Sequence, residues 1–185
     1  MKVIFLDVDG VLNNNGTDRS RYNPTMVDGY REHHYVGIDP VHVAFLNDII
    51  EKSGAKVVLS STWRISFGKE NTLHTMRLSG YKHDIIDVTP DGSTDREVFT
   101  PKHMWDDVPR GNEIAAWMER YAKAHPEDPI THWVVLDDND LKHVQTNEKL
   151  VKTEWYPQNT EGGLREQHVS DVLKHLGVDT TPIGA

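Results

Sequence analysis

The sequence contains no cysteine among its 185 residues. This absence excludes a disulfide framework, a thiolate zinc site and a cysteine nucleophile. An excess of positive charge is also missing, because 29 acidic residues stand against 20 lysines and arginines and leave a formal net charge of -9. Broad binding to duplex nucleic acid needs a basic surface, so we do not expect it here. A small phosphorylated ligand held by one or two cations stays compatible with this charge.

Long hydrophobic runs are absent as well. No segment approaches the roughly 18 apolar residues of a transmembrane helix, so we expect no membrane association. The apolar run at residues 2–6 is followed at once by Asp7 and is too short for a signal peptide, which favours a cytoplasmic location. The length favours a single domain over residues 1–185, because domains usually contain about 100–200 residues.

Short apolar segments alternate with amphipathic ones along the chain. Five segments are typical of buried parallel strands: 2–6, 57–59, 85–88, 133–136 and 150–155. Helical spacing of apolar residues indicates helices at about 40–53, 69–79, 111–121 and 164–176. This alternation predicts an α/β fold built on a parallel sheet of about five strands. Two polar stretches lie outside the pattern: residues 14–38, which we expect to form a flap or small cap insertion, and residues 91–109, which we expect to form a loop.

Polar side chains follow three of the expected strands directly. These are Asp7 and Asp9 after the first, Ser60 and Ser61 after the second, and Asp137 and Asp138 after the fourth. Ligands of open α/β sheets bind outside the carboxyl ends of the strands. If the three strands are neighbours, these side chains therefore converge on one edge of the sheet.

The acids in this set suggest a cation site. Asp7 and Asp9 are two residues apart on an extended segment and point to the same side, where they repel unless a cation or a proton intervenes. Carboxylates with substrate phosphate oxygens hold Mg2+, and a carboxyl with a raised pKa can act as general acid and base. The alternatives are a solvated turn at Asp7–Gly10 and a helix cap at Asp137–Asp140.

The hydroxyls and cations suggest phosphate binding. Ser60, Ser61 and Thr62 suit a phosphate at a helix N-terminus or, alternatively, an ordinary helix cap. Arg64 is either a surface cation or a bidentate phosphate donor. Arg110 opens a predicted helix, where it would neutralise a phosphoryl group unless it is a plain surface residue. Lys102 competes with Arg110 for that role.

Four segments in this order resemble motifs of the haloacid dehalogenase (HAD) superfamily of phosphohydrolases. They are FLDVDGVLN at 5–13, LSSTWR at 59–64, Arg110-Gly111, and VLDD at 135–138. The resemblance covers residues 1–176 and implies a three-layer Rossmann-like sheet with helices on both faces and a minimal cap. More narrowly, SSTWR, RGNEI and VVLDDND look like a subgroup of HAD domains related to RNA-repair phosphatases.

The resemblance implies a role for each acid. Asp7 is expected to be the nucleophile that forms an aspartyl-phosphate. Asp9 is expected to protonate the leaving alcohol and then to activate water, and its backbone carbonyl to bind Mg2+. Asp137 and Asp138 are expected to hold the metal with Asp7 and Asp9, and Asp140 is a further candidate acid. Which of the acids after the fourth strand touches the metal stays open.

The resemblance to the HAD superfamily also implies which residues contact the phosphate. Ser60 is expected to bind the phosphoryl group, with Ser61 or Thr62 nearby. Arg110 takes the place of the family's usual lysine, a departure that changes geometry and hydration. Further candidate substrate contacts are Asn13, Thr62 and Arg64.

The expected function is therefore that of a Mg2+-dependent phosphohydrolase. The first choice of substrate is a nucleotide or the terminal phosphate of a nucleic acid, because a minimal cap leaves room for a bulky substrate. The alternatives are a phosphatase of small sugar or metabolite phosphates, a phosphotransferase, and a non-catalytic phosphate-binding module of the same fold.

Overall fold

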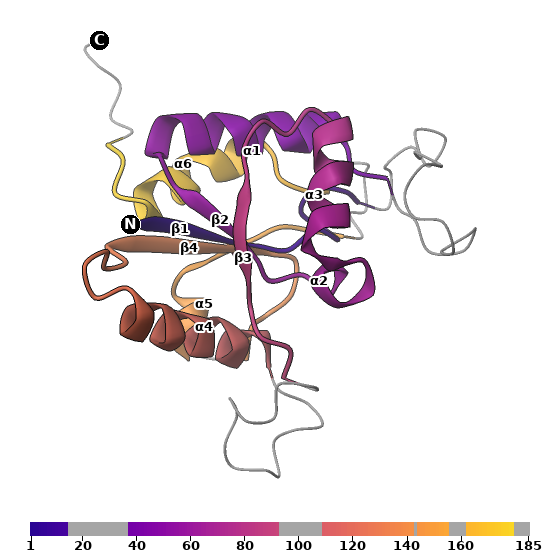
Figure 1. Ribbon diagram of the computed structural model, residues 1–185. Helices are drawn as coiled ribbons and strands as arrows, with labels where there is room; N and C mark the ends of the chain where they lie inside the picture. Colours follow the sequence, from indigo (N-terminus) through magenta and orange to yellow (C-terminus); the bar gives the residue numbers. More distant parts are fainter. Residues whose placement is uncertain (15–36, 93–108, 143, 156–161, 180–185) are drawn as a thin grey trace.

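The computed structural model describes residues 1–14, 37–92, 109–142, 144–155 and 162–179 (Figure 1). Most of the expected flap at 14–38, and most of the loop at 91–109, lie outside these residues. The described chain contains a five-stranded sheet in the order β3-β2-β1-β4-β5, in which every neighbouring pair is parallel. The strands are β1 (Lys2–Leu6), β2 (Lys56–Leu59), β3 (Ile85–Val88), β4 (His132–Asp137) and β5 (Leu150–Lys152). The first strand is thus the central one.

Helices cover both faces of this sheet. On one face lie α1 (Pro40–Ser53), α3 (Gly68–Leu78) and α6 (Glu166–His175), and on the other lies α4 (Arg110–Ala124), with the short α5 (Val144–Asn147) beside it (Figure 1). The short α2 (Trp63–Ser66) follows β2. The expected three-layer, Rossmann-like α/β architecture is therefore confirmed.

Alternation along β1 divides the core into two clusters. Ile4 and Leu6 pack with apolar residues of α1, α3 and α6, whereas Val3 and Phe5 pack on the α4 side, where Phe5 meets the ring of Trp117 edge-on at 5.4 Å. Successive side chains of a strand point to opposite faces. The side chain of the next residue, Asp7, therefore falls on the α4 side of the sheet.

The ends of α1 follow the local signals in the sequence. The Asp39 carboxylate accepts the backbone N–H of Val41 at 2.9 Å, and Pro40 occupies the first helical position. At the other end Gly54 adopts a left-handed φ of 68° and its N–H donates to the Ile50 carbonyl. These caps fix the helix boundaries that the sequence predicts.

Some boundaries differ from the prediction. Two single-turn helices, α2 and α5, were not predicted, and α6 begins at Glu166 rather than at 164. β5 ends at Lys152 instead of extending to 155. The chain leaves the sheet after β5, at Thr153, whose hydroxyl donates to the Gly10 carbonyl at 2.6 Å. The neighbouring strand β4 also ends at Asp137, which already pairs with Lys152. Within the described residues, no helix has the length and apolar character needed to cross a membrane.

Candidate active site

The carboxyl ends of three adjacent strands place Ser60, Asp7 and Asp137 in one row. The N–H of Ser60 donates to the Leu6 carbonyl at 2.9 Å, and the N–H of Asp7 donates to the Leu136 carbonyl at 2.9 Å. Residues in register on parallel strands point to the same face. The sheet therefore brings together side chains that are separated by 50 residues or more in the sequence, as the strand-end pattern predicts.

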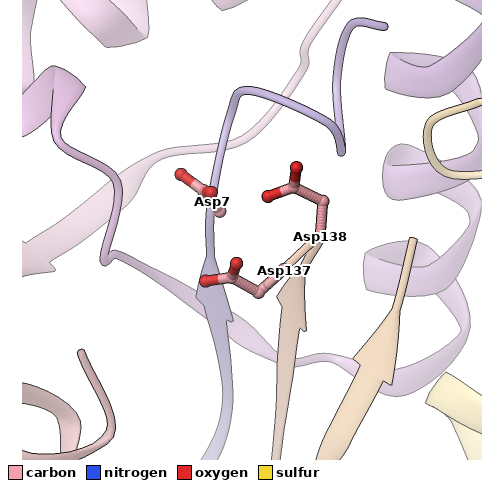
Figure 2. Close-up of side chains that lie close together, drawn as sticks. All are labelled: Asp7, Asp137 and Asp138. Carbon is pink, nitrogen blue, oxygen red and sulfur yellow. The ribbon is translucent and has the colours of Figure 1, made fainter. Parts of the chain in front are cut away.

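Asp7, Asp137 and Asp138 form the acid cluster at this edge (Figure 2). One oxygen from each carboxylate lies within 4.8 Å of the others, and Asp7 and Asp137 are buried. Desolvation, together with the negative charge of Asp7, raises the pKa of Asp137 and of Asp138. Such a cluster favours a cation, and its donor set consists of carboxylate oxygens, the ligands that suit Mg2+.

Arg110, the first residue of α4, contacts two of these acids. Its Nη1 donates to Oδ2 of Asp7 at 2.7 Å and to Oδ2 of Asp137 at 2.5 Å. Burial acts to lower the pKa of Arg110, but the two carboxylates outweigh it and raise that pKa. The guanidinium thus stays charged and compensates one of the three negative charges. Arg110 and Asp137 also line a pocket of about 290 Å³, and Lys102 lies outside the described residues.

The two acids that follow β4 have different surroundings. Both oxygens of Asp137 are engaged by the protein, Oδ2 by Arg110 and Oδ1 by the backbone N–H of Asn139 at 2.9 Å. Asp138 is half-buried, and its Oδ1 accepts from the Asn139 side chain at 2.6 Å. Asp137 therefore anchors the arginine, whereas Asp138 is the more open of the two.

Gly10 lets the loop after β1 pass directly over Asp138. Its φ is 77°, and a Cβ built on it would lie 2.5 Å from Cγ of Asp138. Only glycine fits both the left-handed backbone and this close approach. Asp140 lies apart from this contact, because its exposed carboxylate pairs with Lys152 at 2.9 Å.

Asp9 is held by two side-chain donors. The Asn13 amide donates to its Oδ1 at 3.0 Å, and the Trp63 indole N–H donates to its Oδ2 at 2.9 Å. Burial raises the pKa of Asp9, and these two hydrogen bonds oppose that effect. The side-chain Oδ1 of Asn13 in turn accepts the backbone N–H of Gly10 at 3.0 Å. Asn13 is fully buried and is occupied by the loop itself, which does not favour it as a substrate contact.

The three hydroxyls after β2 differ in their availability. The Ser60 Oγ is buried and has no hydrogen-bond partner within the described residues. A buried polar atom without a partner is uncommon and calls for a ligand or water. The Ser61 Oγ accepts the N–H of Trp63 at 3.3 Å. Thr62 is exposed and makes no side-chain cap to α2.

Arg64 is fully used by the protein. Its five N–H groups donate to the carbonyls of Ser60 and Ser61 after β2, to those of Thr89 and Pro90 after β3, and to the carboxylate of Glu113 on α4. An arginine has five N–H donors, so none remains for a phosphate. In this structure Arg64 joins the ends of two strands to α4, and the expected substrate contact is not favoured.

Two residues that organise the site were not predicted to do so. Trp63 was given no role of its own, and its bond to Asp9 joins residues 54 positions apart. Glu113 belongs to the RGNEI segment but was given no role there, and its carboxylate binds Arg64 at 2.7 Å and the N–H of Gly92 at 2.9 Å. The available signal for Glu113 is its position one helical turn after Arg110.

Comparison with known proteins gives one result for the chain. A family model described as the HAD domain in Swiss Army Knife RNA repair proteins matches residues 3–169. No curated protein and no solved structure matches the chain.

Proposed function

The chain belongs to the family of HAD domains in Swiss Army Knife RNA repair proteins, and from that premise we propose a Mg2+-dependent phosphohydrolase that works through an aspartyl-phosphate. Family membership supports a HAD-type phosphohydrolase, in agreement with the sequence resemblance. The observation that carries the mechanism is the setting of Asp7. Its buried carboxylate ends the central strand, where it accepts from Arg110 and lies beside Asp138.

Asp7 is the nucleophile in this mechanism. Its Oδ1 accepts the N–H of Val8 at 2.9 Å and its Oδ2 accepts from Arg110, so the carboxylate is oriented before substrate arrives. Ser60, on the neighbouring strand end, offers its unpartnered hydroxyl to a phosphoryl oxygen. Arg110 faces the charge that develops on the transferring group.

Asp9 is the general acid and base. It gives a proton to the leaving oxygen while Asp7 is phosphorylated, and it then takes a proton from the water that hydrolyses the aspartyl-phosphate. The phosphate leaves with one oxygen from that water, and the Asp7 carboxylate is restored.

The acid cluster fits Mg2+. Asp7 and Asp138, with the backbone carbonyl of Asp9, would hold the ion, while Asp137 keeps Arg110 in place. When bound, the ion supplies positive charge that shields the substrate phosphate from the negative nucleophile. Mg2+ is commonly held by one or two carboxylates plus substrate oxygens, which agrees with this set.

The proposed substrate is a nucleotide or the terminal phosphate of a nucleic acid. The family description names RNA repair proteins, which favours a polynucleotide end over a sugar phosphate. The net charge of -9 argues that recognition is confined to the phosphorylated end, because a long backbone contact would need a basic surface.

Hydrolysis of p-nitrophenyl phosphate tests the mechanism. We expect activity that requires Mg2+, stops with EDTA and is abolished in Asp7→Asn. The matched control is Asp87→Asn, since Asp87 is also a strand carboxylate that pairs with an arginine of α4, Arg120, at 3.3 Å. Turnover that persists in Asp7→Asn would refute the nucleophile.

A substrate panel tests the substrate class. It compares nucleoside monophosphates, 3′- and 5′-phosphorylated oligonucleotides, and sugar phosphates under the same conditions. We expect the highest kcat/KM among the nucleotides and phosphorylated ends. A clear preference for sugar phosphates would support the alternative of a small-metabolite phosphatase.

A further inference from the structure

Trp63 connects α2 to the proposed acid and base. Its indole ring is buried, at 4% exposure, and meets Phe67 edge-on at a centroid distance of 5.0 Å. From this packed position its N–H reaches Oδ2 of Asp9 at 2.9 Å. Because the ring is buried and packed against Phe67, the indole N–H has little freedom to follow the Asp9 carboxylate if it moves.

The two donors on Asp9 together fix its orientation. Asn13 engages Oδ1 and Trp63 engages Oδ2, so the carboxyl group cannot rotate without losing a hydrogen bond. Each carboxyl oxygen has two lone-pair directions. With one direction on each oxygen occupied, the proton that Asp9 transfers is restricted to the remaining ones.

We propose that Trp63 is a positioning residue for proton transfer, because its indole N–H holds the Asp9 carboxyl in the orientation that delivers a proton to the leaving oxygen. This inference rests on the proposed phosphohydrolase function. The indole N–H of Trp63 is bonded to the Asp9 carboxyl, so the proposed role of Trp63 is to position that carboxyl rather than to take part in the chemistry itself.

The step concerned is the first half of the reaction. A bond forms between an oxygen of Asp7 and phosphorus, and the bond between phosphorus and the leaving oxygen breaks. The electron pair of the broken bond stays on the leaving oxygen, which takes the proton of Asp9. A poor leaving group such as an alkoxide needs this proton, whereas p-nitrophenolate leaves without it. If the Asp9 carboxyl loses its orientation, the resulting fall in the rate of Asp7 phosphorylation should therefore be larger for an alcohol leaving group than for p-nitrophenolate.

The test compares two esters in wild type and Trp63→Phe. The esters are p-nitrophenyl phosphate and a nucleoside 5′-monophosphate, whose leaving group is an alcohol. The readout is kcat/KM in saturating Mg2+, which reports on steps up to phosphorylation of Asp7 and not on hydrolysis of the intermediate. We expect kcat/KM to fall about 10–100-fold for the alkyl ester and less than about 3-fold for the aryl ester. The loss for the alkyl ester stays at or below the roughly 10²–10⁴-fold contribution of a general acid, because Asp9 itself is retained.

Trp117 provides the matched control. It is also a buried tryptophan, and its indole N–H also donates to an aspartate, Asp87, at 2.7 Å, but on β3 away from the acid cluster. Trp117→Phe is expected to leave the ratio of the two kcat/KM values at its wild-type level. If Trp63→Phe fails to fold, 3-benzothienylalanine at position 63 keeps the shape of indole, lacks its N–H and gives the same comparison.

The possible outcomes separate the inference from the function it rests on. A selective loss for the alkyl ester supports the role of Trp63. An equal loss for both esters, or none, overturns it while wild-type hydrolysis still supports the proposed function. A wild type that hydrolyses neither ester overturns both.

Discussion

Replacement of Arg64 by lysine tests how the loops at the sheet edge are held together. The Arg64 side chain is 4% exposed, and its five N–H groups donate to four backbone carbonyls and to Glu113. A lysine ammonium has three donors and is a point charge rather than a planar fork. At least two buried acceptors therefore lose a charged donor in Arg64→Lys.

The size of the effect follows from that count. Hydrogen bonds to charged groups contribute about 1.5–3 kcal/mol each, so two lost bonds lower the free energy of unfolding by about 3–6 kcal/mol. For a chain of this length the melting temperature should fall by at least about 6 °C. Such a loss is a large part of the usual stability of about 5–15 kcal/mol.

Urea unfolding, followed by tryptophan fluorescence and by far-UV circular dichroism, measures this difference. Arg120→Lys is the control, because Arg120 is 51% exposed and pairs with Asp87 at 3.3 Å. An exposed pair of this kind contributes less than about 1 kcal/mol. Equal stabilities of Arg64→Lys and Arg120→Lys would refute the view that Arg64 ties the strand ends to α4.

Two further predictions concern a glycine and a histidine. Gly10→Ala should destabilise the fold and remove Mg2+-dependent hydrolysis, because the added Cβ would lie 2.5 Å from Asp138. Gly54 has a similar φ and open space around it, so Gly54→Ala should lower the free energy of unfolding in urea by only about 1–2 kcal/mol. Equal losses of unfolding free energy in the two variants would contradict the close contact at Gly10. Burial lowers the pKa of His42 from its usual 6.5 in the folded protein. As pH falls, the unfolded chain therefore binds a proton at this histidine before the folded chain does. The free energy of unfolding should fall below about pH 6.5, by at most about 1.4 kcal/mol per pH unit. Urea unfolding between pH 7.5 and 5 should show a smaller loss in His42→Asn, and an identical pH dependence in both proteins would contradict this assignment.

Burial is the main cause of the lowered pKa of His42, and the hydrogen bonds around the ring decide which nitrogen carries the proton. Its Nδ1 lies 2.7 Å from the Leu164 carbonyl and must donate, so its Nε2 is left to accept from the Asn14 amide at 3.0 Å. That amide also donates to the Gly162 carbonyl at 2.9 Å. A second proton on the ring would therefore face a donor, which adds to burial in disfavouring the protonated imidazole.

Much of the fold could be predicted because its signals are local. The apolar run at residues 2–6 and the Asp39-Pro40 and Gly54 caps depend on neighbours within one element, and the structure confirms the strand and the helix that they predict. The end of β5 and the single turns α2 and α5 could not be predicted. They depend on contacts across the chain, such as the Thr153 hydroxyl on Gly10.

The candidate site divides in the same way. Which residue types end the strands could be read from the sequence, because Asp7, Ser60 and Asp137 each follow an apolar run directly. The partners of these residues depend on the tertiary structure. Arg110 bridges Asp7 and Asp137. All N–H donors of Arg64 bind protein acceptors, and the indole of Trp63 binds Asp9. Hydrogen bonds and ion pairs depend on distances and directions between side chains. For these residues, which lie 27 to 103 positions apart in the sequence, the packing of helices against the sheet sets those distances and directions.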